Sequence, residues 1–476
     1  MFQSAEKDKR TSRIFLIGVI LLIVGGAITI GGARNQVRPS SNSYAITSVA
    51  VVDVEKGIIL RDHAVIITGD RIERVAPHSE VSVPEGAQLI DGKGLYLMPG
   101  LVDSHVHYFD QSTFGRLMIA HGVVLVRDMG NPNLLALGLR EKLKRKEILG
   151  PEMLTTGSIL DGDPPFIPSI SLVCKTPEDG RAMVRLQAKA GVDQVKVYSR
   201  LEKDVFHAII EESTRLGLKT VGHVPEAIYL EEAAKAGQKS CEHLFGFGKV
   251  IAKLLDEPVE LKSGGMGTDV PYLSRLAKVD RKELKKVLQR VRDSGMAVCP
   301  TIVVFKHGAH LKEIMAGEFP MLEYVSPLIR GIWKSTWDPS KQATETAGKI
   351  WPHMRAFVKE LHKAGMTLMV GTDLLFPGII PGYSVHEEMI LWQEAGIPPA
   401  DVLRSATEVP ARFVGLDSRL GTVAEGKTAS LVLVSANPLE DIHNASKIEG
   451  VFLRGRYFSR ADLDQLLKET RELCKR

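Results

Sequence analysis

Two histidines one residue apart follow a run of strand-forming residues near position 100. The segment reads LMPGLVDSHVHYFD and contains His105 and His107. Alternate residues of a strand point to the same face, so both imidazoles are predicted to project from one side of one strand. Neutral imidazole is the commonest metal ligand among protein side chains. The pair therefore indicates a chelating metal site, against the alternative of two packed or exposed histidines.

Further polar residues stand at the ends of otherwise apolar, strand-like segments. Lys196 and Tyr198 end QVKVYS, His223 lies in VGHVP, His243 in CEHLFG and Asp373 in VGTDLL. A lysine, four histidines and an aspartate in one apolar ring would be costly to bury unless they pair with one another or bind metal. Their placement on separate segments predicts one shared site at the carboxyl ends of several strands.

The segments that carry these residues alternate with helical patterns. Eight strand-like runs with helices between them predict an α/β fold, a (β/α)8 TIM barrel over residues 98–415. Short β-branched runs broken by turn residues fill residues 45–97 and 416–457. These two segments are predicted to pair into one small β-sandwich, and residues 458–476 are predicted to form a C-terminal helix.

Two stretches exceed what a plain barrel needs, namely residues 249–292 and 306–365. Insertions after barrel strands lie over the catalytic face, so they are candidates for a lid, a dimer contact or a surface resting on a membrane. His307 is predicted to be an ordinary surface or insertion histidine. Cys241 lies two residues before His243 and should share its face of the strand. It is therefore predicted to point into the barrel as small core filler.

The N-terminal segment is not typical of a globular domain. Residues 14–33 are apolar and uncharged, and their length of about twenty residues suffices to cross a bilayer as a helix. Lysines and arginines precede them, which keeps the N-terminus in the cytoplasm. Residues 1–33 are therefore predicted to be an uncleaved transmembrane helix rather than a cleaved signal peptide, and residues 34–44 a polar linker. The catalytic domain would lie outside the cytoplasm, anchored to the membrane, or be secreted if the segment is cleaved.

Charge and cysteine content exclude other classes. The 61 basic and 57 acidic residues leave a formal charge of +4, so charge gives no case for a nucleic-acid partner. The four cysteines are widely spread, with neither zinc-finger spacing nor the density of a disulfide framework.

Taken together, these segments resemble the amidohydrolase superfamily, and most closely its imidazolonepropionase-like and Xaa-Pro dipeptidase-like branch. The resemblance covers nearly all of the chain from Ala45 to about Tyr457. It rests on MPGLVDSHVH, GVVLVRDMG, VKVYS, GHVP, SCEHL, GTD, SVHEE and GTVAEGKTASLVLVSANPLEDI. The resemblance implies a hydrolase that uses two divalent metal ions, with zinc the expected metal.

The resemblance also implies the roles of the residues. The implied ligands are His105, His107, Lys196, His223, His243 and Asp373. Lys196 would carry carbon dioxide as a carbamate that bridges both ions, and only a neutral amine, which a desolvated barrel favours, can form it. A metal-bridging hydroxide would attack an amide carbonyl, with Asp373 as general acid and base. Tyr198 and Arg200 are candidates for binding the substrate's carbonyl or carboxylate.

The expected substrate is a small-molecule amide, either a dipeptide of the Xaa-Pro type or an N-acyl amino acid. Hydrolysis of a cyclic amide or imidazolone, or deamination of a ring, is the alternative within the superfamily. Glu226, three residues after His223, resembles the proton-shuttling glutamate of mononuclear deaminases, but those enzymes lack the strand-four lysine. A non-catalytic, membrane-tethered binding protein is less favoured because all six ligand positions are present. Assembly into a homo-oligomer stays open.

Overall fold

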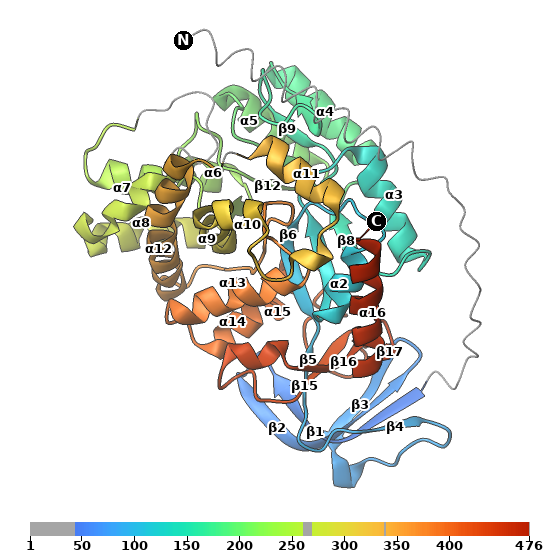
Figure 1. Cartoon of the computed structure of the whole chain (residues 1–476). Coiled ribbons are helices and arrows are strands. Elements are labelled where there is room, and N and C mark those ends of the chain that lie inside the picture. The colour runs from blue at the N-terminus through green and yellow to red at the C-terminus, as the bar shows by residue number, and fades with distance from the viewer. Residues whose placement is uncertain (1–42, 260–268, 338, 476) are drawn as a thin grey trace.

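The computed structural model describes residues 43–259, 269–337 and 339–475 (Figure 1). The predicted membrane segment, residues 1–33, lies outside the described residues, as does the linker up to residue 42. Within the described ranges, every helix is too short or too polar to span a membrane.

The predicted α/β barrel is confirmed. Its hydrogen-bonded strands are β6 (Leu101–Val106), β7 (Val123–Asp128), β8 (Glu152–Thr155), β11 (Gln194–Val197), β12 (Lys219–Gly222), β13 (Ser240–Glu242) and β14 (Ala297–Cys299). Residues 367–374 take the eighth position, where Val298 N–H donates to Thr367 O at 2.8 Å and Ser104 N–H donates to Val370 O at 2.9 Å. These bonds join the eighth segment to β14 on one side and to β6 on the other, which closes the barrel.

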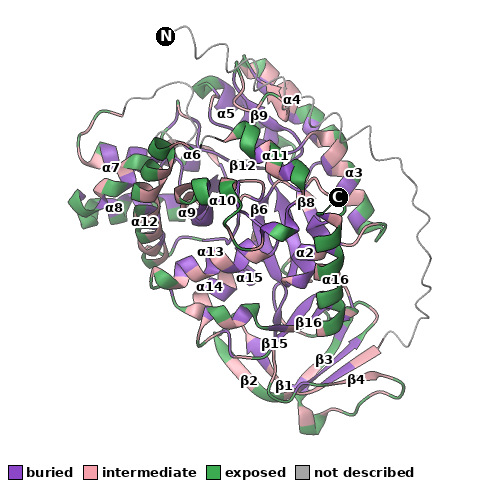
Figure 2. Cartoon of the chain, in the orientation of Figure 1, coloured by how far each residue is buried: buried purple, intermediate pink, exposed green. Residues whose placement is uncertain are grey.

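Helices surround the barrel strands, which are buried on both faces, as expected of a parallel sheet inside an α/β fold (Figure 2). The helices are α2 (Phe114–Ala120), α3 (Asn133–Lys144), α4 (Pro177–Ala190), α5 (Lys203–Arg215), α6 (Leu230–Ala236), α8 (Arg281–Asp293), α13 (Tyr383–Glu394), α14 (Pro399–Ser405) and α15 (Glu408–Phe413). Helix α4 shows how the sequence sets such a boundary. It begins at a capping box of Thr176 and Asp179 and ends at Gly191, whose φ of 83° suits a residue without a side chain.

A second, β-rich unit joins residues from before and after the barrel. Its strands are β1 (Ser43–Asp53), β2 (Ile58–Thr68), β3 (Arg71–Pro77), β4 (Gln88–Asp91), β5 (Tyr96–Pro99), β15 (Leu431–Val434), β16 (Ile448–Leu453) and β17 (Arg456–Ser459). The order is β17-β16-β15-β5-β1-β2-β3, with β4 beside β1, so one sheet replaces the two stacked sheets of the predicted sandwich. Register shifts near Val49 interrupt the β1–β2 ladder and bend it. The sheet curls until Ile72 N–H reaches Lys427 O at 2.9 Å, around a core that includes Val65 and Phe452.

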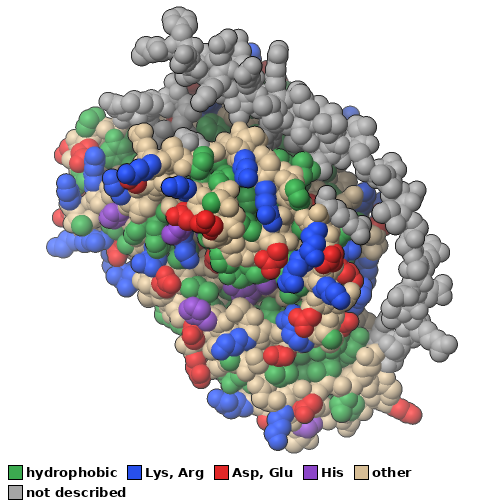
Figure 3. Space-filling model, in the orientation of Figure 1, with side chains coloured by type: hydrophobic (Ala, Val, Ile, Leu, Met, Phe, Trp, Pro, Cys, Tyr) green, Lys and Arg blue, Asp and Glu red, His purple; other side chains and the backbone are tan. Residues whose placement is uncertain are grey.

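The remaining elements connect or flank the strands and helices described above. They are β9 (Ile159–Asp161), β10 (Ser171–Val173), α7 (Phe247–Leu254), α9 (Ile302–Ala309), α10 (Leu311–Ala316), α11 (Pro327–Thr336), α12 (Lys341–Lys363), α16 (Arg460–Leu473) and the short 3-10 helices η1 (His78–Glu80), η2 (Val270–Lys278), η3 (Leu322–Tyr324) and η4 (Ile442–Ser446). On the face shown in Figure 3, basic and acidic side chains of the described residues are interspersed rather than gathered by sign.

His307 lies on α9 within the second insertion, so of the two predicted alternatives the insertion histidine is confirmed and the surface histidine is wrong. Its side chain is fully buried, and its Nε2 lies 3.2 Å from Glu387 Oε1 of α13. Its ring also packs edge-on against Phe319. The correction has a physical cause, because a carboxylate partner offsets the cost of burying a polar ring.

Candidate active site

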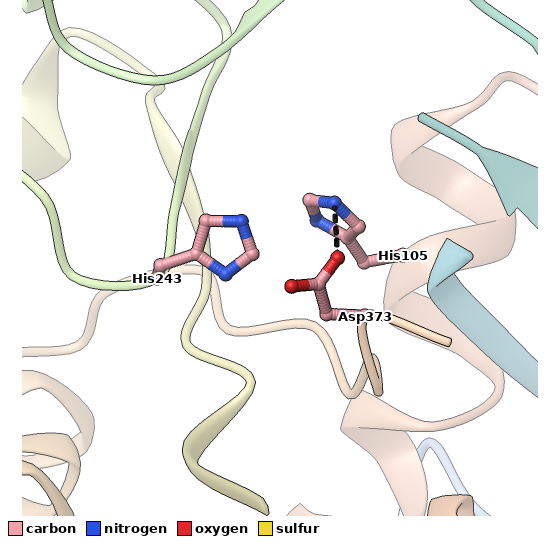
Figure 4. Close-up of side chains that lie close together, drawn as sticks. All are labelled: His105, His243 and Asp373. Carbon is pink, nitrogen blue, oxygen red and sulfur yellow. Dashed lines mark ion pairs between the residues drawn. The ribbon is translucent and has the colours of Figure 1, made fainter. Parts of the chain in front are cut away.

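Three of the predicted ligands face one another at the centre of the barrel (Figure 4). His105 comes from β6, His243 directly follows β13, and Asp373 lies on the eighth barrel segment. One ligand atom from each lies within 4.8 Å of the others. His105 Nε2 is 3.4 Å from Asp373 Oδ1, and the His105 and His243 ring centroids are 4.6 Å apart. The structure thus brings together donors that are distant in sequence.

The other predicted ligands lie against this group of three. His107 Nε2 is 3.4 Å from the same Asp373 oxygen. Lys196 Nζ is 3.4 Å from His105 Nε2. The ring centroid of His223 is 5.1 Å from that of His243. All six residues therefore form one contiguous cluster.

Each histidine of the cluster has its Nδ1 atom held by a neighbouring polar group. The partners are Glu242 Oε2 for His105 at 3.0 Å, Gly130 O for His107 at 2.6 Å, Ser199 Oγ for His223 at 2.9 Å and Thr301 Oγ1 for His243 at 2.7 Å. Such contacts orient metal-ligating imidazoles and leave Nε2 for the ion. His223 Nε2 is buried and has no hydrogen-bond partner among the described residues. A buried, unpartnered ring nitrogen in this setting fits a divalent cation.

Burial sets the protonation of the cluster. It lowers the pKa of His105 and of His223 well below the ordinary histidine range, and lowers the pKa of His243 to about 4. Burial also lowers the pKa of Lys196 to about 8. Burial alone would raise the pKa of Asp373, but the neighbouring His243 and His105 outweigh it and hold that pKa below its usual value. Neutral imidazoles beside an ionised carboxylate are the forms that bind metal.

The strand ends that carry His243 and Asp373 have unusual backbone conformations. His243 has a φ of 59° and Asp373 a φ of 55°, in the left-handed region that non-glycine residues rarely adopt. Residues held this way gather at functional sites, where the surrounding structure fixes them. The turn at His243 also breaks the alternation of β13.

This break makes the predicted inward direction of Cys241 wrong, but its prediction as small core filler is confirmed, because the side chain is fully buried among core residues. Ser240 and Glu242 both contact Arg127 across the barrel, so Cys241 between them faces the opposite side of β13. Its Sγ lies 3.0 Å from Phe245 O. His243 reaches the cluster together with Glu242 because its left-handed φ turns the chain at that point.

Sequence reasoning missed a buried ion pair beneath the cluster. Arg127 Nη2 lies 2.9 Å from Glu242 Oε1, and the two side chains are 2% and 0% exposed. Glu242 also holds His105 Nδ1, so it links the ion pair to a predicted ligand. Glu242 lies with His105 and Cys299 in a second group of closely spaced donors, but the Arg127 guanidinium already neutralises its carboxylate. The sequence signal was present, because both charges interrupt apolar strands.

Replacing Glu242 by glutamine is expected to lower the free energy of unfolding by about 3–5 kcal/mol, because Arg127 is then buried without a charged partner. Metal affinity is expected to fall about 10- to 100-fold, because His105 loses its oriented contact. Urea denaturation and metal titration measure the two effects. Glu425→Gln, which removes an exposed pair with Arg74, is the control and should cost at most about 1 kcal/mol. A Glu242 variant as stable as this control would contradict the assignment.

The two predicted substrate-binding residues differ in their surroundings. Tyr198 is buried, and its ring stacks on His223 with centroids 4.0 Å apart, so it lies against the cluster. Arg200 donates from Nη1 to Pro164 O at 2.9 Å and lies 5.2 Å from the Phe166 ring centroid. These contacts of Arg200 are made to the loop that follows β9.

A barrel of this type, with imidazoles, a lysine and a carboxylate converging at the ends of its strands, defines a class of α/β hydrolases with a metal-ligating site. The chain belongs to the amidohydrolase family, whose family model matches residues 96–457.

Individual relatives are distant. The chain is 22% identical to an ochratoxinase of Aspergillus niger over 352 residues, which cover 70% of this chain and 57% of that protein's length. The structure of bottromycin amidohydrolase matches with a TM-score of 0.73 at 23% identity, covering 92% of this chain and 91% of that one. A Xaa-Pro dipeptidase with bound methionine matches with a TM-score of 0.66 at 18% identity, covering 88% and 100%. At these identities the structural likeness establishes the fold alone.

Proposed function

We propose that this protein is a binuclear, metal-dependent amidohydrolase that cleaves the amide bond of a Xaa-Pro-type dipeptide or an N-acyl amino acid. The observation that carries the proposal is the buried, unpartnered Nε2 of His223, set among imidazoles whose Nδ1 atoms are all held from behind. This arrangement supports a divalent cation better than a structural role for three buried histidines and a partly buried fourth.

The six clustered residues would hold the ions. His105 and His107 would bind one ion with Asp373, His223 and His243 would bind the other, and carbamylated Lys196 would bridge them. Imidazole and carboxylate ligands suit zinc, which is the metal we propose. When bound, the two ions supply a Lewis acid for the carbonyl and a water acidic enough to react at neutral pH.

Lys196 is suited to become the carbamate. Its side chain is 1% exposed, and its pKa of about 8 leaves an appreciable fraction of neutral amine near neutral pH. The neutral Nζ would form a bond to the carbon of carbon dioxide as one C=O π bond opens to an oxygen anion, and the Nζ proton would pass to solvent. The resulting carbamate would be an anionic ligand for the two ions.

Asp373 would move the proton during hydrolysis. Its carboxylate, 21% exposed and ionised, can accept the proton of the attacking water and pass it to the leaving nitrogen. Burial raises the pKa of Tyr198 well above its ordinary value, so its phenol stays protonated and can donate a hydrogen bond to the substrate's carbonyl or carboxylate. Arg200 is the proposed partner of a substrate carboxylate.

The comparisons support peptide-type amides as the first substrates to try. One matched structure is a Xaa-Pro dipeptidase and another is an amidohydrolase of bottromycin. The proposed location is outside the cytoplasm, anchored through residues 1–33, and this part of the proposal rests on the apolar sequence of that segment. Cell fractionation with protease protection tests the location.

Removal of metal is expected to abolish amide hydrolysis by the purified full-length protein. Activity should return fully only when zinc and bicarbonate are added together, because the bridging ligand needs carbon dioxide as well as the ions. Metal content by mass spectrometry should show two ions per chain. One ion per chain, with ammonia released from ring substrates, would contradict the proposal and favour deamination.

A further inference from the structure

In the turn that carries Asp373, two residues out of three have a strained backbone conformation. Asp373 has a φ of 55° and Leu375 a φ of 135°, and neither residue is glycine. Such conformations are unfavourable for residues with a side chain and persist only where the surroundings enforce them. On the barrel side, Asp373 N–H donates to His105 O at 2.8 Å and His107 N–H donates to Leu374 O at 3.1 Å. These bonds fix the first half of the turn.

The second half of the turn is held by the insertion over residues 306–365. Trp333 of α11 donates its indole N–H to Leu375 O at 3.0 Å, and its side chain is 3% exposed. Trp337, which directly follows α11 in an extended conformation, packs its ring edge-on against Phe376, with centroids 4.4 Å apart. The C-terminal end of α11 and the residue after it therefore both contact the turn.

We propose that Trp333 is a positioning residue for Asp373, acting through the carbonyl of Leu375. The accepting Leu375 carbonyl belongs to the same peptide as Phe376 N–H, which donates to Asp373 O at 3.2 Å. Without the indole N–H this peptide can rotate, which breaks the bond to Asp373 O and lets the carboxylate turn. A shift of about 1 Å in a reacting group can cost about a hundredfold in rate. This inference rests on the proposed role of Asp373 in proton transfer, and it assigns the insertion a part in that step.

The inference predicts a dependence on the leaving group that a general structural role would not produce. An unactivated dipeptide amide leaves as a basic amine and needs a well-placed proton donor. A nitroanilide leaves as a weakly basic aniline and needs that donor far less. Loss of the Trp333 hydrogen bond should therefore slow the first substrate selectively.

The test uses the metal-loaded, full-length Trp333→Phe variant, which keeps an aromatic ring and removes the N–H. We expect kcat for the dipeptide to fall about tenfold or more, with KM and metal content unchanged, and kcat for the nitroanilide to fall by a clearly smaller factor, because the nitroanilide depends on Asp373 for the proton of the water but much less for protonation of the leaving group. Trp337→Phe, which keeps an aromatic ring against Phe376, is the matched control and should leave both rates near those of the unchanged protein.

Equal losses on both substrates, or no loss on either, would overturn the inference. Glycine at position 375 takes a φ of 135° without strain. The Trp333→Phe/Leu375→Gly variant should therefore recover most of the dipeptide rate. If the single Trp333 variant does not fold, the rates of this double variant are measured in its place. Failure of the unchanged, metal-loaded protein to cleave any amide would instead overturn the proposed function, and the inference with it.

Discussion

Lys196→Ala is expected to lower kcat/KM for an amide substrate by about a thousandfold and to reduce the metal content of the protein. The proposed carbamate contributes several kcal/mol by neutralising two cations, and each 1.36 kcal/mol corresponds to a tenfold change in rate. Alanine leaves Asp373 as the one carboxylate among the six predicted ligands, so at least one ion should be lost. Steady-state kinetics and mass spectrometry of bound metal measure both effects.

The Lys196 variant also allows a chemical rescue. Formate or acetate can enter the volume vacated by the side chain and replace the missing carboxylate, so either should restore part of the rate and of the metal content. Lys175→Ala, which removes an exposed lysine paired with Asp163, is the control and should change neither property. A Lys196 variant that keeps its ions and its rate would refute the carbamate.

Asp373→Asn is expected to lower kcat by about 10²- to 10⁴-fold, the usual contribution of general acid–base catalysis. Asparagine has nearly the same size and tolerates the left-handed φ of 55°, so the turn should be preserved. What is lost is the ability to accept and return a proton. Rate measurements on the dipeptide, with circular dichroism to confirm folding, test the prediction.

Asp256→Asn is a matched control for the backbone. Asp256 has a φ of 52° but is exposed and lies on the segment after α7, away from the cluster. Its replacement should leave kcat unchanged. If the Asp373 variant retained the rate of this control, the proton would have to pass through another group.

The alternation of strand side chains explains why most of the cluster could be predicted from sequence. His105 and His107 lie on or directly after β6, and Lys196 and Tyr198 have the same spacing on β11. In both pairs the residue between them is apolar, so the local pattern alone assigns a face. The structure places all four beside Asp373 or its neighbours.

The rest depends on information that no local pattern contains. The inward position of Glu242 follows from its pairing with Arg127, which is distant in sequence, and from the left-handed turn at His243. The burial of His307 likewise depends on Glu387, which comes from another helix. The single curled sheet in place of a sandwich reflects register shifts in β1 that composition does not reveal.

The pairing of β5 with β15 has a consequence for how the chain folds. Leu97 lies opposite Leu433, and the entire barrel is synthesised between them. Contacts between such distant residues form slowly, because a long loop must close before they contribute any stability. During synthesis the apolar face of β1 and β2, which includes Ile46 and Val65, stays uncovered by the C-terminal strands until the ribosome has made those strands. Damage to the last strands would leave this apolar face uncovered and expose the sheet to aggregation.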